Sequence, residues 1–568
     1  MVSNIRMSSR WSTRLFLLFL CLPGLLSTPG VFGQATPSST GETVKGTVIN
    51  SVTHEPVGRA LVYSSDSRFA TMTDSEGRFE FSTSSAACGN VSAVACLNSL
   101  AAKKPGFVDG PAPRWGAVQP GKDVTLAVTP EALIIGHISL PSSEPPDRID
   151  IELYRREVRE GRAHWEQAGM ASTRSDGEFR FAELTAGSYK LLTRELLDRD
   201  PLNFNPRAQL LGYPPVYFPH ARDFVSSQVI QLSAGHLFHA EMSLVKHPYY
   251  PVKIPLTNAP PGAAIDVRVS LQGRKEPGFS LGYNQAEQLI EGLLPNGTYT
   301  IEASSYGQSG STGSLTISVR GGPVQGSRMV LTPNRSIAVK VKEEFTAYDE
   351  ANTQGMVSHA HLGGHGPGGY LHVYLEPADD FSAAGAGSLR APASAIDEEL
   401  LIDNVPPGRY WVRVNTSRGY TASITSGGVD LLREPLVVAS AGSSNPIEIV
   451  MRDDWAEIIC TIEDLTPGDS RERENLAAVS AQSSPHIYLI PQSDSPGDFR
   501  DLGILPRGEM SIQVPPGLYR VIALDAPQEE LEYYNAEAMR AYEAKEQVIH
   551  LVPGQKEHLR LHLSAAGE

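Results

Sequence analysis

Short stretches of alternating apolar and polar residues recur along the whole chain, separated by Gly, Pro, Asn and Asp. Examples are residues 44–49, 410–414 and 519–523. A period of two places successive side chains on opposite faces of a strand, so these stretches predict β-strands with one buried face. Helical periodicity is scarce, and the best candidate is residues 535–546, with Asn535 as the predicted N-cap. The pattern therefore predicts an all-β protein with a short helix near its C-terminus.

A tight turn followed by Tyr and a strand returns at nearly constant intervals. The four tyrosines, Tyr189, Tyr299, Tyr410 and Tyr519, lie 110, 111 and 109 residues apart. This interval fits a β-sandwich of ~100 residues and exceeds the ~20–50 residues of a solenoid repeat. We expect each ring at the edge of a sandwich, with its hydroxyl bonded to a nearby backbone group as in a tyrosine corner.

Each repeat also closes with a second turn and a short alternating strand. Five such strands occur, at 124–128, 240–244, 327–331, 446–450 and 559–563. We therefore expect a tandem array of about five Ig-like or transthyretin-like Greek-key β-sandwich domains. The predicted domains are 42–130, 131–245, 246–336, 337–451 and 452–568, the last with a short C-terminal helix.

The N-terminus has the pattern of a secretory signal peptide. Arg6, Arg10 and Arg14 precede an apolar run over 15–22, and small residues follow it. The run is shorter than the ~20 residues that span a bilayer, and no later stretch is long and apolar enough to do so. We predict a signal peptide over 1–35, a linker over 36–41 and a secreted, periplasmic or cell-surface protein.

Charge and motifs argue against several function classes. The chain has 64 acidic and 48 basic residues, a net charge of −16, which disfavours a general nucleic-acid binder. The sequence contains no His-Glu-x-x-His zinc motif, no Gly-x-Ser-x-Gly nucleophile elbow and no phosphate-binding P-loop. We predict that the protein is not an enzyme and that it has no catalytic residues and no cofactor.

Three cysteines remain after the predicted signal peptide. Cys88 and Cys96 lie eight residues apart, and an oxidising compartment would permit a local disulfide between them. The alternative is a pair of buried thiols. Cys460 lies in an apolar alternating stretch and is predicted to be a core residue.

The strongest metal candidate is a group of three histidines, His359, His361 and His365. Three imidazoles in seven residues could bind zinc or copper. The glycines beside them would have to be ordered on binding, and no Cys or carboxylate completes the set. We therefore assign no metal site and expect an exposed insertion between strands of the fourth domain.

Acidic residues at turns have a simpler interpretation than calcium binding. Asp74 and Asp176 each precede a Gly, a pattern typical of hairpin turns, whereas a calcium loop needs six to eight oxygen ligands. Two further carboxylate pairs are expected to be solvated loop ends, namely Asp379-Asp380 and Asp453-Asp454.

The tryptophans offer a route to sugar binding, because an exposed indole can stack on the apolar face of a sugar ring. Trp115 and Trp165 lie near predicted loops and are expected to be exposed, whereas Trp411 and Trp455 lie in strand patterns. A carbohydrate-binding array is therefore an alternative function.

Several residues together resemble the carboxypeptidase regulatory-like domain: Gly46, Pro56, Ala60, Val62, Thr73-Asp74, Gly77, Phe79 and Phe81. The resemblance is good over about 42–81 and fair over 131–192. It implies transthyretin-type β-sandwiches, which carry no catalytic residues in that family.

The whole chain also resembles multi-domain secreted bacterial proteins built from such modules. The resemblance implies a non-enzymatic extracellular role in binding, adhesion or scaffolding, with an extracellular protein or a glycan as partner. A secreted hydrolase, or an accessory part of one, is the alternative from another class.

Overall fold

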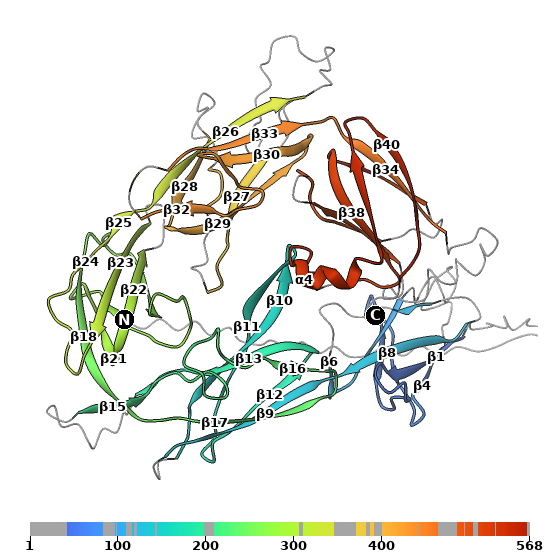
Figure 1. Ribbon diagram of the computed structural model, residues 1–568. Helices are drawn as coiled ribbons and strands as arrows, with labels where there is room; N and C mark the ends of the chain where they lie inside the picture. The colour runs from blue at the N-terminus through green and yellow to red at the C-terminus, as the bar shows by residue number, and fades with distance from the viewer. Residues whose placement is uncertain are drawn as a thin grey trace, which may run out of the picture.

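The computed structural model describes residues 43–564, with gaps. The segments left out are 83–96, 98, 109–115, 119–121, 142–144, 198–208, 306–309, 346–370, 382–386, 391–399, 441, 443, 464–484, 493–494, 504–508 and 529. The described chain is almost entirely strand and folds as a tandem array of five β-sandwich domains (Figure 1). The all-β prediction is therefore confirmed.

The first domain consists of two four-stranded sheets, in the orders β4-β1-β8-β6 and β3-β2-β5-β7. Its strands are β1 (Thr43–Asn50), β2 (Leu61–Ser64), β3 (Ala70–Met72), β4 (Arg78–Ser82), β5 (Ser99–Lys103), β6 (Phe107–Val108), β7 (Gly116–Ala117) and β8 (Val124–Pro130). Phe79 and Phe81 both point into the core, edge to face with ring centroids 5.9 Å apart. This is the face that the alternating pattern predicted for them.

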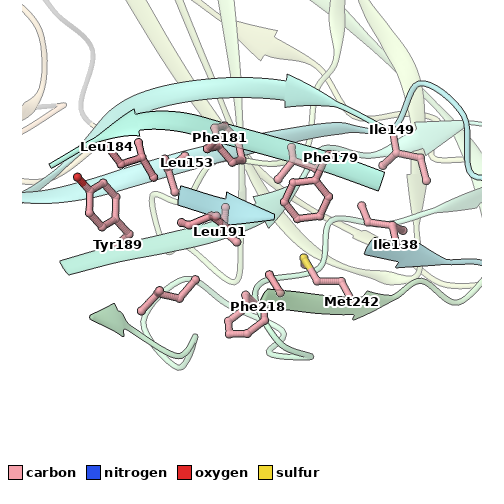
Figure 2. Close-up of a cluster of buried hydrophobic side chains, with 14 of the residues drawn as sticks. Ile138, Ile149, Leu153, Phe179, Phe181, Leu184, Tyr189, Leu191, Phe218 and Met242 are labelled. Atoms are coloured by element: carbon pink, nitrogen blue, oxygen red, sulfur yellow. The ribbon is translucent and has the colours of Figure 1, made fainter. Parts of the chain in front are cut away.

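The second domain pairs the sheets β11-β10-β13-β16 and β12-β9-β17. Its strands are β9 (Ala132–Ser139), β10 (Asp150–Arg159), β11 (Arg162–Ser172), β12 (Glu178–Leu184), β13 (Gly187–Thr193), β16 (Ile230–Leu232) and β17 (Leu237–Ser243). Figure 2 shows its core, where Phe179, Phe181 and Tyr189 pack between the two layers. A Cβ atom on Gly136 would lie 2.1 Å from the Phe179 ring, so the glycine makes room for that ring.

The third domain shares a sheet with part of the second. Its own strands are β18 (His247–Thr257), β19 (Ile265–Leu271), β20 (Gly282–Asn284), β21 (Leu289–Pro295), β22 (Gly297–Ser305), β23 (Ser311–Val319), β24 (Met329–Val330) and β25 (Thr332–Pro333). One sheet runs β19-β22-β23-β25. The other runs β14-β15-β18-β21-β20, and its strands β14 (Leu196–Leu197) and β15 (Leu210–Tyr213) come from the chain before residue 245.

The fourth domain contains the sheets β28-β26-β33-β30-β31 and β27-β29-β32. Its strands are β26 (Arg335–Glu344), β27 (Leu371–Pro377), β28 (Leu401–Val405), β29 (Gly408–Thr416), β30 (Tyr420–Ser426), β31 (Val429–Asp430), β32 (Leu436–Val438) and β33 (Ile447–Arg452).

The fifth domain contains the sheets β37-β34-β40 and β36-β35-β38-β39. Its strands are β34 (Ala456–Ile462), β35 (His486–Pro491), β36 (Arg500–Gly503), β37 (Glu509–Val514), β38 (Gly517–Leu524), β39 (Glu546–Leu551) and β40 (Lys556–Leu561). Cys460 is buried in the core as a free thiol, as predicted, and burial raises its pKa to about 11.

In every domain the first long strand pairs in parallel with a strand near the end of the domain. The pairs are β1 with β8, β9 with β17, β18 with β24, β26 with β33 and β34 with β40. The predicted closing strands are thus the partners of the opening strands. We propose that the boundaries between the five domains lie between these sets of strands, at the limits predicted from the sequence.

The predicted tyrosine corners are present in four domains. The hydroxyls of Tyr189, Tyr299, Tyr410 and Tyr519 each donate a hydrogen bond to the carbonyl oxygen four residues earlier, at 2.9, 3.1, 2.9 and 2.7 Å. All four rings are buried. Each corner therefore ties the turn to the strand that follows it.

The predicted hairpin turns are also present. The Asp74 carboxylate accepts two backbone N–H groups of its turn, at 2.9 and 2.8 Å, and Asp176 accepts one at 3.0 Å. Gly77 and Gly177 follow with φ of +73° and +85°, a conformation that favours glycine.

The predicted helix is shorter than expected. Only α4 (Ala536–Met539) is α-helical, and a 3₁₀ turn over Arg540–Tyr542 follows it. Asn535 caps α4 as predicted, because its side chain accepts the N–H groups of Glu537 and Ala538. The helical prediction is wrong beyond Tyr542, since the chain there turns into β39 and pairs with β38.

Candidate functional site

The most unusual feature of the molecule is the long hairpin formed by β10 and β11. In Figure 1 the five domains follow a curved path, and the tip of this hairpin lies inside the curve, next to α4. Its turn residues Glu160 and Gly161 have φ of +46° and +69°, as in a two-residue hairpin turn. The tip reaches the fourth and fifth domains, so we call its surroundings the central junction.

Arg162 lies between two aromatic rings from different domains. Its guanidinium carbon is 3.8 Å from the ring centroid of Trp411 in the fourth domain and 3.7 Å from that of Tyr534 in the fifth. Burial lowers the pKa of Arg162, yet an arginine stays protonated in proteins. One side chain of the second domain thus joins the two domains at the far end of the chain.

The C-terminal segment forms ion pairs with the same hairpin. Arg155 lies 3.3 Å from the Glu530 carboxylate, and Arg156 pairs with Glu532. The hydrogen bond from Arg156 lowers the pKa of Glu532.

The tip of the hairpin makes contact through its backbone as well. The Gly161 carbonyl accepts the N–H of Tyr534 at 3.3 Å. A Cβ atom on Gly161 would lie 2.6 Å from the Tyr533 ring, so this close contact requires a glycine.

A cluster of aromatic rings extends the central junction towards the third domain. Its members are Tyr154, Trp165, Tyr217, Phe224 and Phe381. Phe381 belongs to the fourth domain, and its ring centroid lies 4.9 Å from that of Phe224 and 5.3 Å from that of Tyr154. This aromatic cluster therefore joins the second and fourth domains.

Lys190 is buried beneath this aromatic cluster. Its ammonium group donates to the Phe224 carbonyl at 2.5 Å and lies 4.7 Å from the Phe224 ring centroid and 5.1 Å from that of Trp165. Burial lowers the pKa of Lys190. These partners identify it as a structural cation, because its donors are directed at protein carbonyls.

Polar contacts fasten the third domain to the same region. The Tyr217 hydroxyl donates to the Pro277 carbonyl at 2.6 Å, and the Phe224 N–H donates to Glu276 at 3.2 Å. Arg274 lies 2.5 Å from the Asp223 carboxylate. The second domain thus contacts the third, fourth and fifth domains.

Several predicted site residues lie outside the described residues. These are His359, His361, His365, Cys88, Cys96 and Trp115, together with the signal peptide over 1–35 and the linker over 36–41. The possible metal site and disulfide therefore stay predictions. Among the described residues, no group of three or more His, Cys, Asp or Glu side chains could hold a metal ion.

The four carboxylates expected to be solvated loop ends are instead engaged. Asp380 lies 3.0 Å from His164 of the second domain, and Asp379 lies 2.9 Å from Arg409. Asp454 accepts the Tyr420 hydroxyl at 2.6 Å, and Asp453 lies 3.9 Å from Arg418. Sequence could not reveal these contacts, because most of the partners are far away along the chain.

The expectation of an exposed Trp165 is wrong. Its ring is half-buried in the aromatic cluster, with its centroid 5.6 Å from that of Phe224. Trp411 stacks on Arg162, and Trp455 packs against Tyr420 at 4.9 Å. The three tryptophans among the described residues therefore serve packing within the molecule rather than a sugar platform.

Within the ranges described, no helix is both long enough and apolar enough to cross a membrane.

Comparison with known proteins yields only weak alignments with solved structures. No family model and no curated protein matches the sequence. Solved structures that align with it include the TIE protein of Bacillus anthracis, at 8% identity, 77% of this chain, 74% of that chain and a TM-score of 0.14. The major pilin subunit of Bacillus cereus aligns at 10% identity, with 57% and 99% of the two chains covered and a TM-score of 0.13. The minor pilin of Streptococcus agalactiae aligns at 10% identity over 36% of this chain and 94% of that chain, with a TM-score of 0.18. At these TM-scores the alignments do not bear on function, so the proposals below rest on this chain's own residues.

Proposed function

We propose that this protein is an extracellular, non-enzymatic scaffold whose β-sandwiches are held in fixed relative positions for binding. The main observation behind this proposal is that the Arg162 guanidinium lies between the rings of Trp411 and Tyr534. Tandem domains joined by short linkers normally move relative to one another. Here one hairpin is held by side chains of two later domains, because Trp411 and Tyr534 follow Arg162 by 249 and 372 residues in sequence.

The use of the ionisable groups supports a non-enzymatic role. Around the central junction they pair with one another across domains, as Arg155 does with Glu530 and His164 with Asp380. A catalytic group must instead reach a substrate in a cleft. These side chains are better suited to holding domains together than to turnover.

An extracellular location follows from the predicted signal peptide over 1–35. Outside the cell, a rigid array of this kind suits adhesion to, or assembly with, an extracellular protein or glycan. Membership of the carboxypeptidase regulatory-like family stays part of this proposal and rests on the resemblance in the first two domains.

The rigid scaffold is tested by opening its central junction. We expect Arg162→Ala to increase the maximum dimension measured by small-angle X-ray scattering, because the variant loses two cation–π contacts worth about 0.5–2 kcal/mol each. Arg148→Ala is the matched control, since Arg148 lies in the same domain with a side chain that is 90% exposed. Equal scattering profiles for the wild type, Arg162→Ala and Arg148→Ala would contradict the proposal.

The non-enzymatic role has its own test. Purified protein is expected to release no product from peptide and glycan substrates. Hydrolysis that a single carboxylate or histidine substitution abolished would favour the hydrolase alternative instead.

A further inference from the structure

The outer face of one sheet of the third domain carries rows of hydroxyl groups. On β22 and β23, Thr298 lies opposite Ser318 and Thr300 lies opposite Thr316. The hydroxyl oxygens of each pair are 3.3 Å apart. Further along the same face, Glu302 lies opposite Ser314 and Ser304 lies opposite Thr312. The two strands therefore present a polar face, which we call the hydroxyl ladder.

Alternation along β23 keeps this face free of large apolar side chains. Thr312, Ser314, Thr316 and Ser318 point outward, whereas the intervening Ile317 and Val319 are buried in the core. Arg320 follows on the same side as the hydroxyls. At ~3.4 Å per residue, the line from Thr312 to Arg320 is about 27 Å long.

One end of the hydroxyl ladder opens into a groove between the third and fourth domains, with a volume of about 280 Å³. Three cations line it, Arg268 and Lys275 from the third domain and Arg409 from the fourth. Arg268 pairs with Asp266 at 3.0 Å and donates to the Phe381 carbonyl at 2.8 Å, so its charge is already engaged. Lys275 forms no ion pair with a described residue. Arg409 keeps a 55% exposed side chain although it pairs with Asp379 at 2.9 Å. The cations that the groove offers to a ligand are therefore Lys275 and the exposed Arg409.

Glu302 is the one carboxylate among the described residues that line the groove. It lies opposite Arg268 on one neighbouring strand and Ser314 on the other. Glu302 and Tyr410 line the same groove, where burial and the charges of Asp379 and Glu302 raise the pKa of Tyr410 to about 12. A carboxylate here can accept hydrogen bonds from the hydroxyl groups of a ligand.

The other end of the hydroxyl ladder has a second hollow, of about 400 Å³. Thr316, Ser318 and Arg320 line it, together with Gly322 and Gln325. Cations thus flank the row of hydroxyls at both ends.

We propose that the hydroxyl ladder and its groove bind one chain of an acidic polysaccharide. The acidic group of one sugar occupies the groove beside Lys275 and Arg409, and the hydroxyls of the following sugars bond to the Ser and Thr side chains. Charge-assisted hydrogen bonds to the acidic group supply most of the affinity. The site goes beyond the scaffold role, which stands whether or not this ligand binds.

A polysaccharide fits this surface better than a peptide does. β22 lies between β19 and β23 and is paired on both edges, whereas β23 pairs with β22 along its length and with β25 only at Ser311 and Thr312. A peptide cannot extend the sheet through β22, because both of its edges are paired. The outward positions also lack the apolar pockets that hold peptide side chains, whereas hydroxyl groups both donate and accept, as sugars require.

The test is calorimetric titration of the full mature chain with polygalacturonate, dextran sulfate, neutral dextran and polyglutamate. We expect polygalacturonate or dextran sulfate to bind and neutral dextran to fail. The stronger of the two acidic polymers identifies the group as a carboxylate or a sulfate. The double variant Lys275→Ala/Arg409→Ala is expected to bind about tenfold more weakly or worse. Thr316→Val tests the hydroxyl ladder with little change of shape and is also expected to weaken binding.

The matched control is Lys340→Ala, because Lys340 is a 66% exposed cation on β26 that is not among the residues lining the groove. Its binding should equal that of the wild type. The proposal is overturned if neither acidic polysaccharide binds, if the double variant binds as tightly as Lys340→Ala, or if polyglutamate binds more tightly than both acidic polysaccharides. Scattering of the same samples separates this failure from failure of the scaffold, whose dimensions do not depend on the groove.

Discussion

At the scale of single residues, a few side chains have structural roles that their neighbours in sequence do not reveal. The tyrosine hydroxyls close turns within domains, whereas Arg162 and Phe381 act between domains. The four tyrosines are buried, Arg162 and Phe381 are half-buried, and in both cases the polar group or ring has a specific partner. Loss of such a partner costs more than loss of an exposed contact.

The tyrosine corner of the third domain provides a clean test. Tyr299→Phe keeps the ring but removes the 3.1 Å hydrogen bond to Pro295. We expect a loss of about 0.5–1.5 kcal/mol in the free energy of unfolding, measured by urea denaturation. Tyr250→Phe in the same domain is the control and should be nearly neutral. Equal effects of the two substitutions would show that the corner adds no stability.

The ion pair between Glu532 and Arg156 predicts a pH dependence. Its hydrogen bond lowers the pKa of Glu532 below the ordinary value of 4.5, so its stabilisation is present above that value and is lost as the pH falls through the lowered pKa. Glu195 and Glu276, at the contact with the third domain, have pKa values raised by burial and respond in the opposite sense. A fall in pH should therefore weaken the contact between the C-terminal segment and the hairpin before it weakens the contact with the third domain.

Hydrogen exchange of residues 530–542 between pH 3 and pH 7 measures this loosening. We expect faster opening in acid for the wild type, and in Glu532→Gln little further change with pH. Glu537→Gln, in α4, is the control. A pH profile that Glu532→Gln left unaltered would rule out this ion pair as the cause.

At the scale of elements, the β10–β11 hairpin is long because it serves two purposes. The base of β10 packs in the core of the second domain through Ile151 and Leu153, whereas the tip supplies Arg155, Arg156 and Arg162 to other domains. The strands β13 and β38 are buried on both faces for a related reason. The aromatic cluster covers one of them and the segment containing α4 covers the other.

Gly161 tests the fit of the hairpin tip. Gly161→Ala places a Cβ atom 2.6 Å from the Tyr533 ring and also strains a residue with φ of +69°. Gly262→Ala carries the same strain, with φ of +73°, but meets nothing within 4 Å. We expect Gly161→Ala to lower the free energy of opening of residues 530–542 by about 1–3 kcal/mol more than the control, as measured by hydrogen exchange. Similar effects would show that the close contact is unimportant.

At the scale of the whole molecule, the array is more than five independent domains joined by linkers. Each domain has its own apolar core. Yet β14 and β15, which precede residue 245, extend a sheet of the third domain by pairing with β18. The second and third domains therefore form one structural unit.

Fragments of the chain test this unit. A fragment over 246–336 lacks β15 and exposes the edge of β18, so we expect it to aggregate or to melt at a lower temperature than the same domain within 131–336. A fragment over 42–130, whose strands pair only with one another in the described structure, should unfold cooperatively by calorimetry. A fragment over 246–336 that melted like 131–336 would contradict the shared sheet.

The sequence by itself determined the all-β class, the tyrosine corners, the turns at Asp74 and Asp176 and the cap at Asn535. These features depend on local alternation, on backbone conformation and on groups only a few residues apart, so nearby residues are enough to specify them. The tertiary structure alone decided the parallel pairing of the closing strands, the sheet shared by two domains, the position of Arg162 between two rings and the hydroxyl ladder beside its groove. Each of these depends on which surfaces meet after the chain has folded, and no periodicity in the sequence records a contact between residues hundreds of positions apart.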